Sequence, residues 1–335
     1  MRRYRFDTFG LDHLRLEEGD AGPPGPGEVL LDVKAFSLNY RDLMVIKGLY
    51  NPNLTLPATP ISDAAGVVAA VGAGVQRVKI GDRVTSHFIA DWLDGPVRGE
   101  YVQTTLGTPG AGLAAEQVVL PAEAVVPMPA GYTFTQAATL PIAALTAWSA
   151  LRTVTHVGSG QTVLTLGTGG VSIFALQLAK QMGARVIITS SSDEKLAWAR
   201  DLCADETINY RTRPDWAEAV LDMTGGVGVD LTVENGGPGT LNQTLRATRA
   251  GGTIALLGAL TGRKGEITTG LILMKRLTIA GIFVDSRAKF EEMNRFIEAQ
   301  QVRPVIHRTF PFEAFPEALR LMEAGGHFGK IVVEV

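Results

Sequence analysis

Cysteine is almost absent from this chain, since Cys203 is the only one among 335 residues. A single cysteine excludes an intramolecular disulfide and any zinc site built from four thiolates. An unpaired thiol is typical of proteins in a reducing compartment, so we expect a cytoplasmic location. We expect Cys203 itself to lie in a helix core and not to act as a reactive thiol.

Charge of one sign and long apolar runs are also lacking. The formal net charge of -3 and a sequence pI of about 6.0 give no field that would gather nucleic acid or an anionic membrane surface. No run approaches the roughly 20 apolar residues of a membrane-spanning helix, and the N-terminal residues contain no apolar signal segment. We therefore expect a soluble, unprocessed protein that binds a small molecule, with neither nucleic acid nor a membrane as partner.

Glycine and apolar residues are abundant, with 38 glycines and 46% hydrophobic residues, and the chain is long enough for two compact domains. Residues 1–125 show short strands between Gly-Pro turns. Residues 126–302 alternate apolar strands with amphipathic helices, which predicts an α/β fold with a doubly wound parallel sheet. Residues 303–335 return to strands around one helix, and we expect them to rejoin the sheet of the first domain.

A glycine-rich turn follows the apolar strand 162–166 and leads directly into a helix. Gly167 allows the tight turn, Gly169 lets the backbone approach a phosphate, and the N–H groups that open the helix would face the anion. The third position of this fingerprint holds Ser172, which we expect to pack the helix slightly less tightly against the strand. An ordinary strand-to-helix turn is the alternative interpretation. The pattern predicts a dinucleotide pyrophosphate site, formed by Gly167, Thr168, Gly169, Gly170 and Val171.

The segment after this turn completes a βαβ unit. Apolar residues recur at helical spacing over 171–182, Gly183 is placed to end the helix, and residues 184–189 form a second buried strand. At the end of that strand, enzymes that bind NAD place a carboxylate, which bonds the ribose 2′-hydroxyl. Ser190 and Ser191 stand there instead, and their hydroxyls can donate to a 2′-phosphate that a carboxylate would repel. The sequence therefore favours NADPH, although Asp193 could either cap the next helix or reach the ribose and let NAD compete.

Several motifs in order along the chain carry a resemblance to a known family. They are residues 37–42 (SLNYRD), 62–72 (SDAAGVVAAVG), 81–84 (GDRV), 140–147 (LPIAALTA) and the turn at Gly167. Along essentially its whole length the chain resembles the medium-chain dehydrogenase/reductase superfamily. Within that superfamily it is similar to the zinc-independent branch, which contains quinone oxidoreductases and alcohol dehydrogenase-like proteins. The resemblance implies a GroES-like catalytic domain, a Rossmann domain, and a homodimer formed through the last sheet strand within 277–284.

The resemblance raises the question of whether this chain binds zinc. In the zinc alcohol dehydrogenases of this superfamily the catalytic metal is held by Cys, His, and Cys or Asp, and the matching positions here are Asn39, Ser62 and Ile142. None of these is a customary zinc ligand. The lobe that would hold a structural zinc is replaced by the glycine-rich segment 91–112. The five histidines lack ligand spacing, and we interpret each as a surface or satisfied core residue, so we expect no zinc.

The resemblance also implies the catalytic residues. Tyr50 matches the catalytic tyrosine of enoyl reductases in this superfamily, and a phenol keeps a donatable proton at neutral pH. Asn39 resembles the polar residue beside the nicotinamide, which can orient a carbonyl. Tyr50 could instead only anchor the loop that follows it. We expect Asp42 to cap a helix or pair with Arg41, and Asp63 to make a structural hydrogen bond.

Further cofactor contacts follow from the resemblance alone. Lys195 and Tyr210 match residues that bind the 2′-phosphate. The remaining matches are Asn39, Tyr40, Arg41, Thr146, Asn235, Gly258, Leu260, Phe283, Val284, Phe328 and Lys330.

The leading hypothesis is a zinc-independent reductase that transfers a hydride from NADPH to a quinone or an α,β-unsaturated carbonyl. Without a metal, hydrogen bonds or a proton donor must stabilise the oxygen charge that develops. Two alternatives stay open: a metal-free alcohol or aldehyde dehydrogenase, and an NADPH-binding protein with weak or no catalysis. The substrate expected is thus a small quinone, enone or aldehyde.

Overall fold

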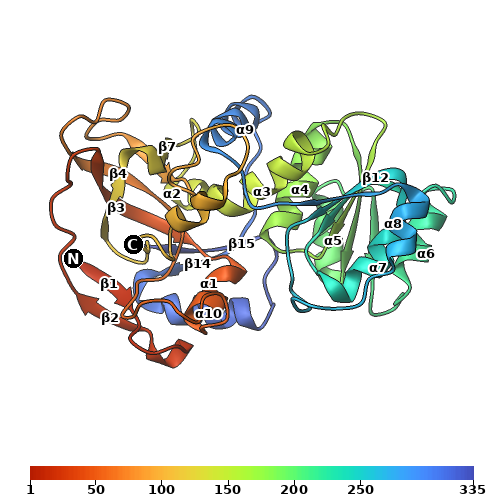
Figure 1. The fold of residues 1–335 in the computed structure, drawn as a ribbon, viewed down its shortest axis with the longest axis horizontal. Coiled ribbons are helices and arrows are strands. Elements are labelled where there is room, and N and C mark those ends of the chain that lie inside the picture. The colour runs from red at the N-terminus through yellow and green to blue at the C-terminus, as the bar shows by residue number, and fades with distance from the viewer. The chain divides into compact units, whose positions relative to one another are not determined.

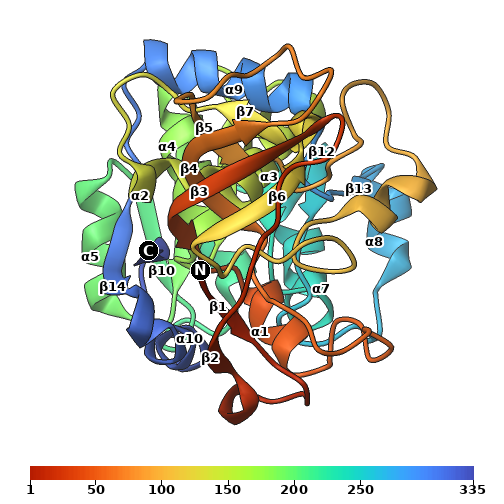
Figure 2. The same ribbon diagram turned by 90° about the vertical axis from the view of Figure 1, so that its left-hand side faces the viewer.

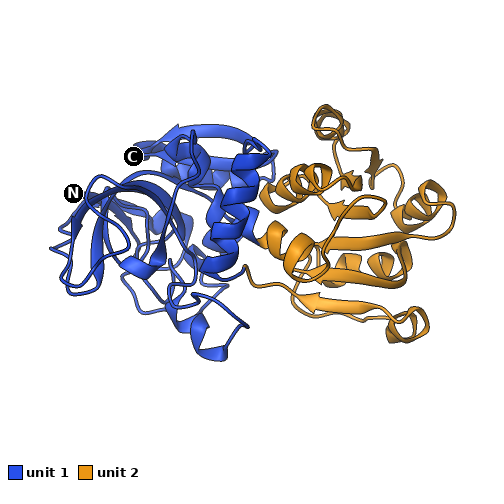
Figure 3. Cartoon of the chain, turned by 90° about the horizontal axis from the view of Figure 1, so that it is seen from above, with its two compact units in different colours: residues 1–145, 285–335 blue, residues 146–284 orange.

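The chain folds into two units, which the computed structural model describes over residues 1–335 (Figure 3). Unit 1 comprises residues 1–145 and 285–335, and unit 2 comprises residues 146–284. Unit 2 is shorter at both ends than the range 126–302 expected from the sequence. The reason is that β7 (Val125–Pro127) and α9 (Arg287–Ala299) belong to unit 1, where an α9 amide donates to a β7 carbonyl at 3.2 Å.

Unit 2 is built on a six-stranded sheet in the order β10-β9-β8-β11-β12-β13. Every neighbouring pair is parallel. Because the chain starts in the middle at β8, moves outward to β10 and then resumes at β11 on the other side, the sheet is doubly wound. The strands are β8 (Thr162–Leu166), β9 (Arg185–Ser190), β10 (Glu206–Asn209), β11 (Val229–Glu234), β12 (Thr248–Leu256) and β13 (Thr278–Gly281). The helices that flank it (Figure 1) are α4 (Gly170–Gln181), α5 (Asp193–Asp201), α6 (Trp216–Met223), α7 (Pro238–Ala247) and α8 (Thr269–Lys275).

Unit 1 contains a mostly antiparallel seven-stranded sheet in the order β14-β15-β3-β4-β5-β7, with β6 paired to β3. Figure 2 shows β3, β4, β5 and β7 side by side. Its strands are β3 (Glu28–Ser37), β4 (Asp63–Val71), β5 (Arg83–Ser86), β6 (Gln117–Pro121), β7, β14 (Ile306–Pro311) and β15 (Lys330–Glu334), while β1 (Arg2–Arg5) and β2 (Arg15–Glu18) form a separate hairpin. Its helices are α1 (Tyr40–Ile46), α2 (Phe134–Ala137), α9 and α10 (Phe315–Glu323), and α3 (Leu145–Trp148) spans the boundary between the units. Short 3₁₀ or π turns lie at Leu11–His13, Gly99–Thr104, Ala122–Ala124, Leu140–Ala144, Ser149–Thr153 and Phe312–Ala314.

The C-terminal tail completes the core of unit 1. β15 pairs antiparallel with β3, with Val333 opposite Phe36. On one side of this sheet the Phe315 ring packs edge-on against Phe36 at 5.0 Å and against Tyr4 at 5.1 Å. Aromatic pairs of this geometry add to the energy of burial alone. The tail therefore rejoins the first sheet, as the sequence predicts.

The predicted fold class is confirmed, because a β-rich unit accompanies a doubly wound parallel sheet. The prediction for Cys203 was wrong. α5 ends at Asp201, and Cys203 lies beyond it with a left-handed φ of 68° and an exposed side chain, so it contributes nothing to a helix core. None of the helices has both the length and the apolar character needed to cross a bilayer.

Candidate functional site

The turn between β8 and α4 in unit 2 fits an anionic ligand. Gly167 has a φ of +75°, a conformation that favours glycine, and Gly169 precedes the first residue of α4. A Cβ atom added at either glycine would meet no atom within 4 Å, so the space beside the turn is open. No side chain caps the start of α4. The N–H groups of its first turn are thus free to bind a phosphate.

Ser172, which we expected to pack the helix slightly less tightly, takes part in two hydrogen bonds at this turn. Its buried hydroxyl donates to the carbonyl oxygen of Leu166 at 2.7 Å and so ties α4 to β8. The Asn235 amide nitrogen, at the end of β11, donates to Ser172 Oγ at 2.8 Å and to the same Leu166 oxygen at 3.0 Å. Asn235 therefore holds the turn together from the neighbouring strand.

The residues predicted for the 2′-phosphate gather at the ends of β9 and β10. Ser190 closes β9, and its carbonyl oxygen accepts from the Tyr210 backbone N–H at 3.0 Å. Ser192 caps α5 by accepting from the backbone N–H of Lys195 at 3.3 Å. Burial lowers the pKa of the Lys195 ammonium, and nearby Glu194 acts in the opposite direction. Ser191 lies between the two serines that close the strand and open the helix.

The side chain of Asp193, the first residue of α5, is already hydrogen-bonded within the protein. Its Oδ1 accepts from the Asn209 side-chain amide at 2.7 Å. This bond and the cap made by Ser192 both favour the alternative in which Asp193 helps to begin the helix, over the one in which it binds the ribose.

The other predicted cofactor residues of unit 2 also follow strand ends. Gly258 and Leu260 come after β12, and their backbone N–H groups donate to the carbonyl oxygens of Glu234 and Asn235. A Cβ atom at Gly258 would lie 2.3 Å from the Asn235 oxygen, so only glycine fits. Phe283 and Val284 come after β13, while Thr146 is buried in α3. Ligands of open parallel sheets gather at this edge.

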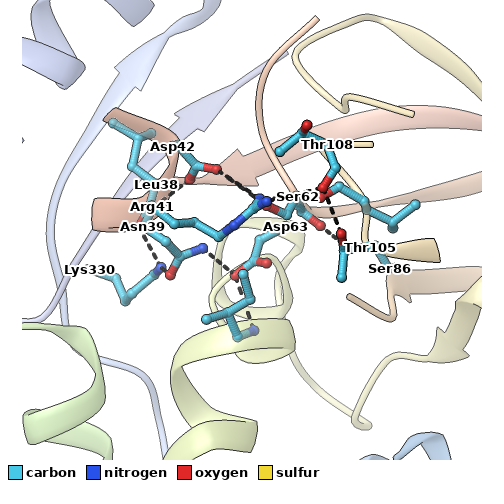
Figure 4. A network of polar contacts seen from close by, with 12 residues as sticks. Leu38, Asn39, Arg41, Asp42, Ser62, Asp63, Ser86, Thr105, Thr108 and Lys330 are labelled. Carbon is cyan, nitrogen blue, oxygen red and sulfur yellow. Dashed lines mark hydrogen bonds and ion pairs between the residues drawn. The ribbon is translucent and has the colours of Figure 1, made fainter. Parts of the chain in front are cut away.

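A network of polar contacts joins side chains of unit 1 (Figure 4). Asn39 Oδ1 accepts from the Lys330 ammonium at 2.8 Å, and Asn39 Nδ2 donates to Asp63 Oδ2 at 2.8 Å. Lys330 also donates to the carbonyl oxygen of Leu38 at 2.6 Å, and Asp63 also accepts from the Ile142 backbone N–H at 3.2 Å. Because an ammonium can only donate, the Asn39 amide has one allowed orientation.

Charges in this network are buried. Burial raises the pKa of Asp63 to about 7, with the Lys330 ammonium opposing the shift. Burial also lowers the pKa of Lys330, against the attraction of Asp63 and Asp42. The pKa of Asp42 is raised by burial and is lowered in turn by the Arg41 guanidinium. Asp63 Oδ1 has no hydrogen-bond partner.

The three positions that the resemblance matches to zinc ligands all contact this network. Asn39 bonds to Asp63, Ile142 offers its backbone N–H, and Ser62 Oγ donates to Asp42 Oδ1 at 3.2 Å. An amide, a backbone N–H and a hydroxyl are poor matches for a zinc ion, which prefers thiolate, imidazole or carboxylate. No group of three or more His, Cys, Asp or Glu side chains is arranged to hold a metal ion. These residues do not fit zinc.

Arg41 and Tyr50 lie together, and Arg41 points inward. The guanidinium carbon lies 4.7 Å from the centre of the Tyr50 ring and 4.8 Å from that of Phe88. No group of the chain hydrogen-bonds the Tyr50 hydroxyl, whereas Tyr40 is half exposed on the surface. Asp42 accepts from the Asn39 backbone N–H at 2.8 Å and contacts Arg41 at 3.7 Å, as predicted.

Two contacts of unit 1 were not predicted from the sequence. Lys330 and Asn39 are 291 positions apart, and Phe88 carries no motif that would link it to Arg41. Phe328, expected to reach the cofactor, is buried in unit 1. Only the pairing of β15 with β3 brings Lys330 to its partner, so no local pattern could have indicated it.

Two family models match the chain. Residues 25–130 match the family described as alcohol dehydrogenase GroES-like domain, and residues 170–299 match the one described as zinc-binding dehydrogenase. A zinc-type alcohol dehydrogenase-like protein of Schizosaccharomyces pombe is 43% identical, with 98% of this chain and 97% of the relative covered. A quinone oxidoreductase of Pseudomonas aeruginosa is 32% identical, with 95% and 94% covered.

Solved structures resemble the chain over its full length. A structure named NAD-dependent alcohol dehydrogenase has a TM-score of 0.92 and 35% identity, with 100% of both chains covered. The mycobacterial protein Rv1454c in complex with NADPH has a TM-score of 0.85 and 26% identity, again with 100% of both chains covered.

Proposed function

The chain belongs to the medium-chain dehydrogenase/reductase superfamily, and from this premise we propose that it transfers a hydride from NADPH to a quinone or an α,β-unsaturated carbonyl without zinc. One observation carries the proposal. At the positions where zinc relatives have metal ligands, the Asn39 amide is fixed between Lys330 and Asp63. This arrangement offers hydrogen-bond donors in place of a metal.

Unit 2 would hold the cofactor. The open turn from Gly167 to Val171 would bind the pyrophosphate. The 2′-phosphate would be bound by Ser190, Ser191, Lys195 and Tyr210. The carboxylate of Asp193 would not compete for the ribose, because the Asn209 side-chain amide already donates a hydrogen bond to it. Bound NADPH would supply the hydride. A 26% identical relative whose structure contains NADPH supports this choice, while a 35% identical one named as NAD-dependent makes the preference a point to test.

Unit 1 would handle the oxygen of the substrate. When a hydride adds to the β-carbon of an enone, negative charge develops on the carbonyl oxygen, and fixed donors stabilise it. Asn39 has a second amide proton on Nδ2 for this purpose, and Lys330 keeps that nitrogen from turning away. The Tyr50 hydroxyl, which no group of the chain engages, would deliver the proton.

A substrate panel tests this function directly. NADPH and NADH should be compared by kcat/KM with quinones, enones and aldehydes, and the reverse reaction should be run with alcohols, after metal analysis of the purified enzyme. We expect NADPH to be preferred, quinones or enones to turn over, and zinc to be well below one per chain. Stoichiometric zinc or a clear preference for NADH would overturn the corresponding part. Turnover of alcohols alone would favour the dehydrogenase alternative, which the names of the relatives also support.

Tyr50→Phe tests the proton donor. It should lower kcat by about 100-fold, as expected for loss of a general acid, and leave the Kd for NADPH unchanged. Tyr101→Phe, which alters a phenol whose ring stacks on Trp92 elsewhere in unit 1, serves as the matched control. A near-normal kcat in Tyr50→Phe would leave this residue only the role of a loop anchor.

We also propose that the enzyme is a cytoplasmic homodimer. β13 lies at the edge of the unit 2 sheet and pairs only with β12. Leu273 and Met274 of α8, which precedes β13 in the chain, are 77% and 82% exposed, and such exposure is unusual for large apolar side chains. A second copy of the chain would cover both features.

A further inference from the structure

Arg41 supports the ring of Tyr50 from inside unit 1. We propose that Arg41 is a positioning residue that holds the Tyr50 phenol, and with it the proton to be donated, in one place. The inference rests on the proposed function, in which Tyr50 is the proton donor. It gives Arg41 a role different from the cofactor contact that the sequence resemblance implies.

The guanidinium of Arg41 lies over two aromatic rings. Its carbon is 4.7 Å from the Tyr50 ring centre and 4.8 Å from the centre of Phe88, which is itself 1% exposed. A planar cation stacked on an aromatic face is attracted by the charge distribution of the ring, and the attraction grows when water is excluded. Phe88 is thus a fully buried partner of the guanidinium, whereas Tyr50 is only partly buried.

Hydrogen bonds hold the guanidinium independently of Tyr50. Arg41 NH1 donates to Ser62 Oγ and, at 3.2 Å, to the carbonyl oxygen of Leu106, while NH2 donates to that of Thr108 at 3.4 Å. The Asp42 carboxylate lies 3.7 Å from NH1, and the Arg41 side chain is only 11% exposed. Because these partners come from separate segments of unit 1, the guanidinium cannot shift without breaking several contacts.

Tyr50, in contrast, has few anchors of its own. Its backbone N–H donates to the Met44 carbonyl oxygen at 3.0 Å, and its ring is partly buried against the core of unit 1. The preceding Leu49 is 59% exposed, and Pro52 and Asn53 after it are exposed as well. A ring on such a loop depends on its stacking partner for a defined direction.

Ser62, at a position that the resemblance matches to a zinc ligand, helps to hold the Arg41 guanidinium in place. Its hydroxyl accepts from Arg41 and donates to Asp42, so the side chain at that position orients the arginine. A lysine could not replace Arg41, since an ammonium offers neither the planar stack nor the fork that reaches three acceptors.

A double-mutant cycle on kcat tests the inference. Arg41→Met should lower kcat about 10-fold when Tyr50 is present, since displacement of a reacting group by a fraction of an ångström is costly. In the Tyr50→Phe background the same change should lower kcat less than about twofold, because no phenol remains to be positioned. Arg41→Lys should recover only part of the loss. Equal losses from Arg41→Met in both backgrounds would overturn the positioning role and leave the proposed function standing.

Arg83 provides the matched control. Its guanidinium stacks on Phe134 at 4.5 Å and donates to the Tyr132 carbonyl oxygen at 3.0 Å in the same unit. Arg83→Met should change stability, but it should not show a kcat loss that depends on Tyr50.

Hydrogen–deuterium exchange supplies a readout that needs no turnover. Residues 47–59 should exchange faster in Arg41→Met than in the wild type, and they should be unaffected in Arg83→Met. Unchanged protection of this loop in Arg41→Met would overturn the inference. An unchanged kcat in Tyr50→Phe would instead remove Tyr50 from the mechanism, and the exchange data would then decide whether Arg41 holds the loop at all.

Discussion

At the scale of single residues, the orientation of the Asn39 amide depends on Lys330. Nζ of Lys330 donates to Asn39 Oδ1, and the buried carboxylates of Asp63 and Asp42 attract its positive charge. Burying an ammonium costs free energy, and two buried carboxylates offset that cost only while all three groups remain together.

Lys330→Met should therefore lower the free energy of unfolding by about 3 kcal/mol, because it leaves the buried carboxylate of Asp63 without its cation, while Asp42 keeps Arg41 at 3.7 Å. Urea unfolding at pH 7 measures the change. Lys289→Met is the control, since that ammonium pairs with Glu292 at 2.7 Å near the surface and its loss should cost less than about 1 kcal/mol. Similar losses in both variants would contradict a special role for Lys330.

Asp63 should make stability depend on pH. Burial raises its pKa to about 7 in the folded protein, whereas an unfolded aspartate titrates near pH 4. The folded state therefore binds this proton more tightly, so the stability that Asp63 contributes is present below about pH 4 and is lost as the pH rises through about 7.

Comparison of the wild type with Asp63→Asn tests whether the free energy of unfolding falls as the pH rises. An amide oxygen can still accept from Asn39 but does not titrate, so wild-type unfolding free energy should fall relative to that of Asp63→Asn between pH 5 and pH 8. Asp20→Asn, at an exposed aspartate, should show no such divergence. A difference that stays constant across this range would rule out titration of Asp63.

Single residues also show where sequence interpretation succeeds and fails. The structural hydrogen bond of Asp63 and the capping role of Asp42 are local consequences of motifs, and both were predicted correctly. The inward turn of Arg41 was not predictable, because Phe88 and Leu106 meet it only through the packing of distant loops.

At the scale of elements, the link between β8 and α4 depends on Ser172. Replacing it by glycine would restore the usual fingerprint but would remove the bond to Leu166 and leave an Asn235 amide proton with one acceptor fewer. Ser172→Gly should thus lower the free energy of unfolding by about 1 to 2 kcal/mol and weaken NADPH binding severalfold.

Thermal unfolding and a fluorescence titration with NADPH measure these two effects. Ser159→Gly, at an exposed loop position of the same unit, controls for the flexibility that glycine adds. A gain in both stability and affinity in Ser172→Gly would mean that the serine does loosen this turn.

Elements with continuous apolar runs were the easiest to predict. The strand expected at 184–189 is β9 at Arg185–Ser190, and Gly183 follows α4 with a φ of +82°, as its predicted role as helix end requires. The last strand, expected within 277–284, is β13 at Thr278–Gly281, and apolar residues continue past its last ladder pair. Cys203 was misplaced for the related reason that hydrophobic character does not mark where a helix stops.

At the scale of the whole molecule, the apolar surface beside β13 is the feature with a consequence for assembly. Leu260, Ile267, Leu273, Met274 and Phe283 are all more than one-third exposed in or near the elements that flank this edge strand. An edge strand with exposed apolar neighbours is a site where chains associate, and a two-fold pairing would limit the association to two copies.

Leu273→Lys combined with Met274→Lys should convert the proposed dimer to a monomer, because four charges would be brought together across a two-fold interface. Light scattering coupled to size-exclusion chromatography measures the mass, which should fall by half. Val227→Lys, at a side chain 63% exposed elsewhere in unit 2, is the control and should leave the mass unchanged. A wild-type mass equal to one chain would refute the dimer, and a double variant that stays dimeric would place the interface on another surface. Since Leu273 and Met274 lie outside the residues proposed to hold NADPH, retention of cofactor binding in the monomeric variant would show that assembly and binding are separate properties of unit 2.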